Sequence, residues 1–226
     1  MAGRRSPAVE KGHHAGRTAP NKGRTYPAEV LTQREVSLLL RACGARSSTG
    51  LRNRALITVL YRAGLRLGEA LALEPKDVDT GAGTINVRRG KGDKQRVVGL
   101  DPAAAAVVEV WLGRRSALGV SSRRPLFCTL QGQPLKSSYV RTLLPRLAAK
   151  AGIEKRVHPH GLRHSHAAEL AAEGFPLNLI QAQLGHESLA TTDRYLRHIA
   201  PAQLITAMQA RVWADAGANW TATTDD

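Results

Sequence analysis

Residues 158–195 read HPHGLRHSHAAELAAEGFPLNLIQAQLGHESLATTDRY, and the interpretation of the whole chain starts from this stretch. His160 and Arg163 lie three residues apart at the head of an amphipathic segment, which puts both side chains on one helix face. A Leu184-Gly185-His186 helix stop follows, and Tyr195 comes nine residues after His186. Such a face suits an anion with several oxygens, such as a phosphodiester.

Composition points to a basic protein of one domain. The chain has 226 residues, enough for one core with a small appendage but short for two full domains. Lysine and arginine number 33 against 18 Asp and Glu, which gives a net charge of +15 and a pI of about 10.8. A polyanion is therefore the expected partner, with binding that weakens as salt rises. Composition alone also leaves open a basic protein of ribosomal or chromatin type.

The sequence predicts neither a disulfide framework nor a membrane segment. Cys43 and Cys128 lie far apart in apolar contexts, and no CxxC pair is present. No apolar run approaches the roughly 18 residues that a bilayer span needs, and the N-terminus lacks the apolar region of a signal peptide. We expect a reduced, cytoplasmic protein that associates with DNA in the nucleoid.

The chain divides into an arm, a folded domain and a tail. Residues 1–24 are rich in arginine, lysine, glycine and proline and predict a disordered basic arm, either a ligand of a DNA groove or a solvated tail. Residues 25–215 are predicted to form the domain, and 216–226 a disordered tail. Helices are expected after Thr32, which forms a capping box with Glu35, and over 51–62, 102–118, 137–150 and 176–184.

An arginine lies in an apolar setting in the segment Leu65-Arg66-Leu67-Gly68-Glu69. A desolvated guanidinium is costly unless it is paired, and Glu69, three residues on, is placed to pair with it. Two interpretations follow. The pair only orders the core, or the carboxylate orients Arg66 so that its remaining N–H groups bind two phosphate oxygens.

Residues 84–100 alternate with a period of two around the turn residues Gly90 to Asp93, which predicts an antiparallel hairpin. Ile85 and Val87 alternate with polar residues, and Val97 and Leu100 do so more weakly. The fold class is therefore mainly α with a small antiparallel sheet. The hairpin has a basic tip, which either discourages aggregation at a sheet edge or carries a lysine into a DNA groove. Its basic residues are Arg88, Arg89, Lys91, Lys94 and Arg96, of which Lys94 and Arg96 are candidate DNA contacts.

The histidines at 158, 160, 164 and 166 suggest a metal site as one hypothesis, because imidazoles bind zinc. No HExxH motif and no nearby acidic or thiol ligands accompany them, so no metal is predicted. His164 is expected instead to orient its helix or Arg163. Tyr195 stands in a polar frame, whereas Tyr139 is interpreted as a packing residue.

Five segments together resemble the catalytic domain of the tyrosine recombinase (phage integrase) family over about residues 30 to 200. They are GLRLGEALALEPKDVD at 64–79, RRGKGDKQRVVGL at 88–100, HGLRH at 160–164, LGH at 184–186 and TTDRY at 191–195. The resemblance implies site-specific cleavage and rejoining of double-stranded DNA through a covalent 3′-phosphotyrosine. It implies a catalytic set of Arg66, Lys91, His160, Arg163, His186 and Tyr195, with Glu69 and His164 in support.

The chemistry accounts for this set. Arg66 and Arg163 would neutralise charge on the non-bridging phosphate oxygens, while His160 and His186 donate to those oxygens or move protons near pH 7. The resemblance makes Tyr195 the nucleophile, and Lys91, in Gly-Lys-Gly, the acid that protonates the departing 5′-oxygen. Because the phosphotyrosyl bond stores the energy of the diester, rejoining needs no ATP. No cofactor is expected, since the sequence has neither a carboxylate cluster nor a P-loop.

Two features leave the assembly open. Residues 201–215 predict an amphipathic helix that either folds back or docks in a neighbouring subunit, as the family's C-terminal segment does in a tetramer on DNA. The family's usual N-terminal DNA-binding domain has only the basic arm in its place. The chain is then a short member resembling the DNA invertases, needs a separate DNA-binding partner, or is a fragment. Alternative functions are relaxation of DNA by a type IB topoisomerase and a non-catalytic DNA-binding regulator of recombination.

Overall fold

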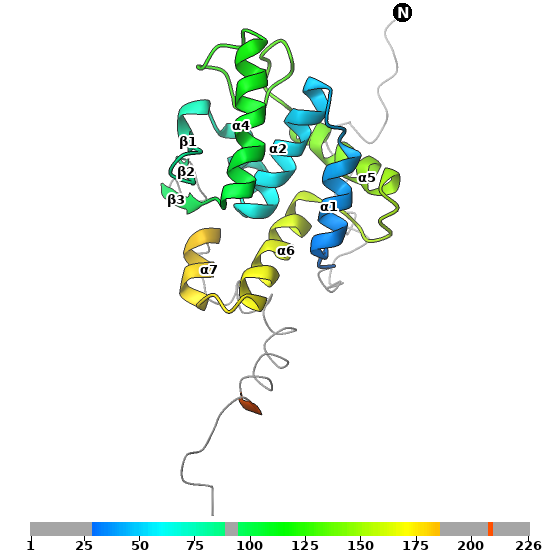
Figure 1. Ribbon diagram of the computed structural model, residues 1–226, viewed down its shortest axis with the longest axis vertical. Coiled ribbons are helices and arrows are strands. Elements are labelled where there is room, and N and C mark those ends of the chain that lie inside the picture. Colours follow the sequence, from blue (N-terminus) through cyan, green and yellow to red (C-terminus); the bar gives the residue numbers. More distant parts are fainter. Residues whose placement is uncertain (1–28, 89–94, 186–207, 210–226) are drawn as a thin grey trace, which may run out of the picture.

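The computed structural model describes residues 29–88, 95–185 and 208–209, and Figure 1 shows how their elements are arranged. This part of the chain is mainly helical with one small antiparallel sheet, which confirms the predicted fold class. In chain order the elements are α1 (Gln33–Ala42), α2 (Ser48–Arg62), α3 (Leu67–Ala72), a 3-10 turn (Pro75–Asp77), β1 (Val78–Asp79), β2 (Thr84–Val87), β3 (Arg96–Gly99), α4 (Pro102–Ala117), α5 (Ser137–Lys150), α6 (Pro159–Ala172) and α7 (Leu177–Leu184).

Helix α2 forms the centre of the core. Every residue from Ala55 to Tyr61 is buried, as expected for a helix that is covered on all sides. It packs mainly against α4 and α6 and also contacts α1 and α3. The Ser47 hydroxyl accepts a hydrogen bond from the Gly50 amide at 3.0 Å, so the helix begins three residues before the predicted start. It ends just before Gly64, whose φ of +62° confirms the predicted stop.

Local signals set the other helix ends as well. The capping box predicted for α1 is present: Thr32 Oγ1 accepts from the Glu35 amide at 3.2 Å, and Glu35 Oε2 accepts from the Thr32 amide at 2.7 Å. Helix α5 matches its predicted range, and α4 and α7 each differ from theirs by one residue at one end. Gly185 ends α7 in the left-handed conformation, with φ +63° and ψ +52°.

The predicted hairpin is confirmed, with Thr84 paired to Gly99 and Val87 to Arg96. On β3, Val97 is 65% exposed whereas Val98 is 1% exposed. Cross-strand partners share one face of a sheet, and Val98 is the partner of buried Ile85. A two-residue third strand, β1, extends the sheet and was not predicted.

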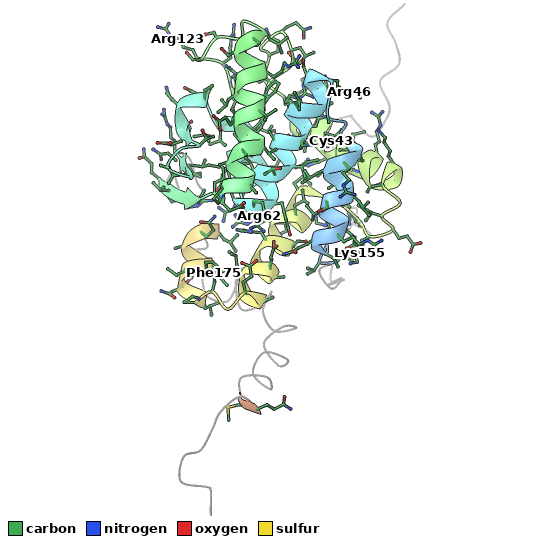
Figure 2. All side chains as sticks on the ribbon, viewed as in Figure 1. Cys43, Arg46, Arg62, Arg123, Lys155 and Phe175 are labelled. Carbon is green, nitrogen blue, oxygen red and sulfur yellow. The ribbon has the colours of Figure 1, made fainter. Side chains whose placement is uncertain are left out.

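Helices α6 and α7 lie together at one end of the molecule, where α6 packs against α2 and α5 (Figure 1). Helix α7 contacts β3. Arg62, at the end of α2, donates from Nε to Asp101 at 2.7 Å and lies 2.9 Å from Glu169 of α6 (Figure 2). Asp101 also caps α4 by accepting from the Ala104 amide at 3.0 Å. None of the helices within the described ranges has the length and apolar character needed to cross a membrane.

Candidate active site

A basic cleft lies where the start of α3, the middle of α5 and the start of α6 meet. Its volume is about 510 Å³. The lining contains four arginines and two histidines, and none of its residues is acidic, which favours an anionic ligand. The lining residues are Leu65, Arg66, Leu67, Arg141, Pro145, Arg156, Val157, His158, Pro159, His160 and Arg163.

The Arg66–Glu69 pair expected from the sequence is present. Arg66 Nη1 donates to Glu69 Oε1 at 2.8 Å, and the Arg66 backbone amide donates to Oε2 at 2.9 Å. The Arg66 side chain is 33% exposed and lines the cleft, whereas the Glu69 side chain is 4% exposed. Burial alone would raise the pKa of Glu69, but hydrogen bonds from Arg96 and Arg66 outweigh burial and hold that pKa below its ordinary value. Glu69 therefore stays ionised and fixes the direction of the Arg66 side chain.

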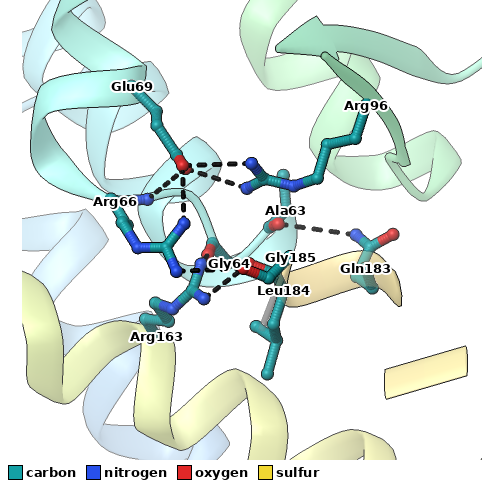
Figure 3. Close-up of polar contacts among 9 residues, drawn as sticks. All are labelled: Ala63, Gly64, Arg66, Glu69, Arg96, Arg163, Gln183, Leu184 and Gly185. Carbon is teal, nitrogen blue, oxygen red and sulfur yellow. Dashed lines mark hydrogen bonds and ion pairs between the residues drawn. The ribbon is translucent and has the colours of Figure 1, made fainter. Parts of the chain in front are cut away.

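Arg163 reaches the cleft from α6 and is only 2% exposed. One terminal nitrogen donates to the Gly64 carbonyl, and the other donates to the Leu184 carbonyl at 2.5 Å. Arg66 makes a related contact, from Nη2 to the Gly185 carbonyl at 3.0 Å (Figure 3). Both arginines thus donate hydrogen bonds to carbonyls at the end of α7, those of Leu184 and Gly185, which immediately precede His186 in the chain.

His160 lies at the exposed start of α6 and lines the same cleft. Partial desolvation lowers its pKa, and the charges of Arg163, His158 and Arg66 lower it further, so the imidazole is neutral at pH 7. His164, one turn on, is buried and meets the His160 ring edge to face, with 4.0 Å between ring centroids. The contact places His164 as a support for the His160 ring.

Four predicted site residues, Lys91, Lys94, His186 and Tyr195, lie outside the described residues, as do the basic arm, the C-terminal tail and nearly all of 201–215. Their roles stay predictions. The described segments include residues close in sequence to Lys91 and His186. Strand β3 begins five residues after Lys91, and α7 with its cap ends one residue before His186.

Arg96 has a different environment from the one expected of a DNA contact. Its Nη1 and Nη2 donate to the two oxygens of Glu69 at 3.0 and 2.8 Å, and its side chain is 14% exposed. The prediction that Arg96 binds DNA therefore has no support from its position.

Sequence reasoning missed several residues of the cleft. Arg141 and Arg156 are exposed arginines in its lining, and the only available signal was that Arg156 precedes the histidine segment. His158 caps α6, since its Nδ1 accepts from the Gly161 amide at 2.9 Å.

Tyr139, interpreted as a packing residue, accepts a hydrogen bond from Arg52 at 2.6 Å. No group of three or more His, Cys, Asp or Glu side chains in the described ranges is arranged to hold a metal ion.

Comparison with known proteins gives one consistent family. The family model described as "Phage integrase family" matches residues 29–201. The tyrosine recombinase XerC of Mycobacterium tuberculosis is 36% identical over 208 residues, covering 87% of this chain and 69% of that protein. XerC of Rhodospirillum centenum is 38% identical over 180 residues, covering 79% of this chain and 52% of that protein.

Solved structures agree with the sequence comparison. The crystal structure of XerA recombinase superposes with a TM-score of 0.73 at 31% identity, covering 85% of this chain and 69% of that one. XerH recombinase, in a post-cleavage complex with a palindromic difH substrate, superposes with a TM-score of 0.67 at 32% identity. The match covers 81% of this chain and 53% of that one. Neither a topoisomerase nor a non-catalytic regulator is favoured by these matches. The chain belongs to the phage integrase family and is a site-specific tyrosine recombinase.

Proposed function

We propose that this recombinase breaks and rejoins DNA by transferring a phosphodiester to Tyr195, with the cleft around Arg66, His160 and Arg163 as the site of that transfer. One observation carries the proposal. Arg66 from the start of α3 lines one cleft with the neutral His160 and with Arg163 from α6, and the lining of that cleft contains no acidic residue. A phosphodiester gains negative charge on its non-bridging oxygens in the transition state, and guanidinium groups stabilise such charge.

In the cleavage step the Tyr195 oxygen attacks the scissile phosphorus, and the bond from phosphorus to the 5′-oxygen breaks. His160 takes the phenol proton, which its lowered pKa and neutral state at pH 7 allow. Lys91 gives a proton to the departing 5′-oxygen, and His186 donates to a non-bridging oxygen. The products are a 3′-phosphotyrosyl bond and a free 5′-hydroxyl.

Rejoining is the same step in reverse. The 5′-hydroxyl of a second strand attacks the phosphotyrosyl phosphorus and gives its proton to Lys91, and the Tyr195 oxygen leaves with a proton returned from His160. One phosphoester bond is exchanged for another in each direction, so the exchange consumes no nucleotide triphosphate.

Covalent trapping tests this proposal. The full chain is mixed with nicked suicide duplexes that carry a randomised core, so that a short 5′-hydroxyl fragment diffuses away after cleavage. We expect a protein–DNA adduct on a denaturing gel with the wild-type chain and none with Tyr195→Phe. Tyr139→Phe is the matched control and retains the adduct, because Tyr139 serves packing and a hydrogen bond to Arg52. An adduct with Tyr195→Phe, or none with the wild type while it binds DNA, contradicts the proposal.

The assembly belongs to the same proposal. DNA is the partner, as the solved complexes of related recombinases with DNA support. We expect a tetramer on DNA, held through the apolar face of 201–215, with a separate DNA-binding partner supplying part of the site recognition. Sedimentation of the chain on trapped DNA should give a tetramer, and Val212→Glu, which charges that face, should give smaller complexes. A wild-type monomer on trapped DNA would contradict this arrangement.

A further inference from the structure

Arg96 is the first residue of β3, on the strand that returns from the hairpin loop carrying Lys91. Its side chain leaves the sheet and meets Glu69 of α3, with each terminal nitrogen donating to a separate carboxylate oxygen, at 3.0 and 2.8 Å. A planar guanidinium paired to a carboxylate through two parallel bonds is held in both distance and orientation. The base of the hairpin is thereby fixed to α3.

Glu69 serves two arginines at once. Its Oε1 also accepts from Arg66 Nη1 at 2.8 Å, so Arg66 and Arg96 lie on either side of one carboxylate (Figure 3). The Glu69 side chain is 4% exposed, so the carboxylate that the two arginines share is shielded from water and salt. A change in the position of the Arg96 guanidinium therefore reaches Arg66 through a single shared group.

Arg96 also packs against the end of α7. A Cβ atom added at Gly185 would lie 2.7 Å from Arg96 Nε and 2.8 Å from Cζ, so the guanidinium rests directly on this glycine. The Gly185 carbonyl accepts from Arg66 Nη2 at 3.0 Å. Arg96 thus contacts the backbone of Gly185, the residue before His186. It also contacts the carboxylate that holds Arg66.

We infer that Arg96 is a positioning residue, which locks the hairpin base, Arg66 and the end of α7 into one rigid unit. The link itself is a property of the described structure, and its effect on cleavage rests on the proposed function. Arg96 touches no reacting atom. It acts by fixing β3, which follows Lys91 in the chain, and the end of α7, which precedes His186, relative to Arg66. A small misplacement of a catalytic group lowers the reaction rate strongly.

The same contacts argue against Arg96 as a phosphate ligand. Both terminal nitrogens donate to the buried Glu69 carboxylate, and Arg96, unlike Arg66 and Arg163, does not line the basic cleft.

The test variant is Arg96→Lys, which keeps the charge but cannot form the two-bonded pair. A second anchor between β3 and α7 remains in this variant, because Gln183 exchanges two hydrogen bonds with the Gly99 backbone, both 2.9 Å. The fold should therefore survive. A matched control is Arg123→Lys, the same exchange in an exposed loop at the end of the molecule opposite Phe175 (Figure 2).

Single-turnover cleavage is measured at saturating concentrations of a suicide duplex recovered from trapped adducts. We expect Arg96→Lys to lower the cleavage rate by about 10- to 100-fold while the Kd for that duplex changes less than about threefold. In a Glu69→Gln background the same substitution should lower the rate by less than about threefold, because Arg96 acts through Glu69. Equal losses in both backgrounds, or a wild-type rate in Arg96→Lys, overturn the inference.

Two further readouts separate the alternatives. Hydrogen exchange of the protein without DNA should be faster at the end of α7 and in β3 of Arg96→Lys, and unchanged exchange at both overturns the link. The hydrogen-exchange measurement tests the link even if the wild type forms no adduct. The absence of an adduct would count against the proposed function alone. For Arg96→Met, the dependence of log Kd on log salt should match that of wild type. A slope lower by about 0.9 identifies Arg96 as a phosphate contact and overturns the inference.

Discussion

At the scale of single residues, the protonation of His160 decides what it does. Partial desolvation lowers its pKa below 6.5, and the electrostatic influence of Arg163, His158 and Arg66 lowers it further. Its neutral ring is therefore the dominant form at pH 7, which is the form that accepts a proton from a tyrosine.

The rate of single-turnover cleavage should report this pKa. We expect a rate that is constant near pH 7 and falls as acid protonates His160, with the midpoint of that acidic limb below 6.5. His160→Gln should lower the plateau by about 100-fold and remove the limb. A limb with its midpoint above 6.5, or one that persists in the variant, contradicts the role of His160 as the base.

His166 is a second residue whose environment favours the neutral form. It is 3% exposed, and neither ring nitrogen has a hydrogen-bond partner among the described residues. Burial lowers its pKa from 6.5 to about 4, with the charge of Arg62 adding to the effect. The unfolded chain then binds a proton more tightly than the folded one, so this group stabilises the fold above pH 6.5 and loses that contribution as pH falls toward 4.

Urea unfolding at two pH values checks the consequence. Between pH 7 and pH 5 the wild-type free energy of unfolding should fall by about 2 kcal/mol through His166 alone. His166→Phe fills a similar volume without a titrating group, so its loss over the same interval should be smaller by about that amount. Equal losses in the two proteins would show that His166 is not buried in its neutral form.

At the scale of elements, the cleft is built by segments that contribute arginines of two kinds. Arg66 and Arg163 are held by the backbone and by Glu69, whereas Arg141 on α5 and Arg156 before α6 are exposed in the lining. Exposed arginines at the rim of such a cleft are placed to meet the DNA backbone on either side of the scissile phosphate.

Removing both rim arginines should weaken binding without changing the chemical step. For Arg141→Ala/Arg156→Ala we expect the slope of log Kd against log salt to fall by about 1.8, since each phosphate contact contributes about 0.9. The cleavage rate at saturating DNA should stay within about twofold of wild type. Arg146→Ala removes an exposed arginine of α5 outside the cleft lining and should leave the slope unchanged. An unchanged slope in the double variant would exclude these arginines as phosphate contacts.

Among the elements, the helix ends could be predicted from the sequence and the strand register could not. Helix ends were predicted closely because their signals are local, as at Thr32, Gly64 and Gly185. The inward face of β3 could not be predicted in this way, because it depends on which residue pairs with Ile85 across the hairpin, and period-two alternation does not fix that register.

The site divides in the same way. The Arg66–Glu69 pair spans three residues and was predicted from spacing alone. The bond from Arg96 to Glu69 spans 27 residues and that from Arg163 to Gly64 spans 99, and no local pattern reveals either. A basic residue in a hairpin looks the same in sequence whether it binds a phosphate or a buried carboxylate, which is why Arg96 was assigned to DNA.

At the scale of the whole molecule, Arg62 joins three helices. It pairs with Asp101 at the start of α4 and with Glu169 of α6, whose side chain is 10% exposed. Because α6 carries His160 and Arg163, this junction connects the core around α2 to the cleft.

Breaking the junction should destabilise the domain. We expect Arg62→Met to lower the free energy of unfolding by about 2 to 3 kcal/mol, since it removes the positive charge that pairs with the largely buried Glu169 carboxylate. Arg62→Met/Glu169→Gln should recover part of that loss. Lys76→Met breaks an ion pair whose lysine side chain is 59% exposed and should change stability by less than about 0.5 kcal/mol. A loss that small for Arg62→Met would show that the junction carries little of the stability.

The chemistry of the trapped bond tests the central claim most directly. The adduct is digested with protease and nuclease, the modified peptide is identified by mass spectrometry, and the released DNA end is offered to a polynucleotide kinase. Tyr195 should carry a nucleotide through its 3′-phosphate, and the released end should accept phosphate without prior dephosphorylation because it is a 5′-hydroxyl. A nucleotide on another residue, a linkage through the 5′-phosphate, or a released end already phosphorylated would contradict the account.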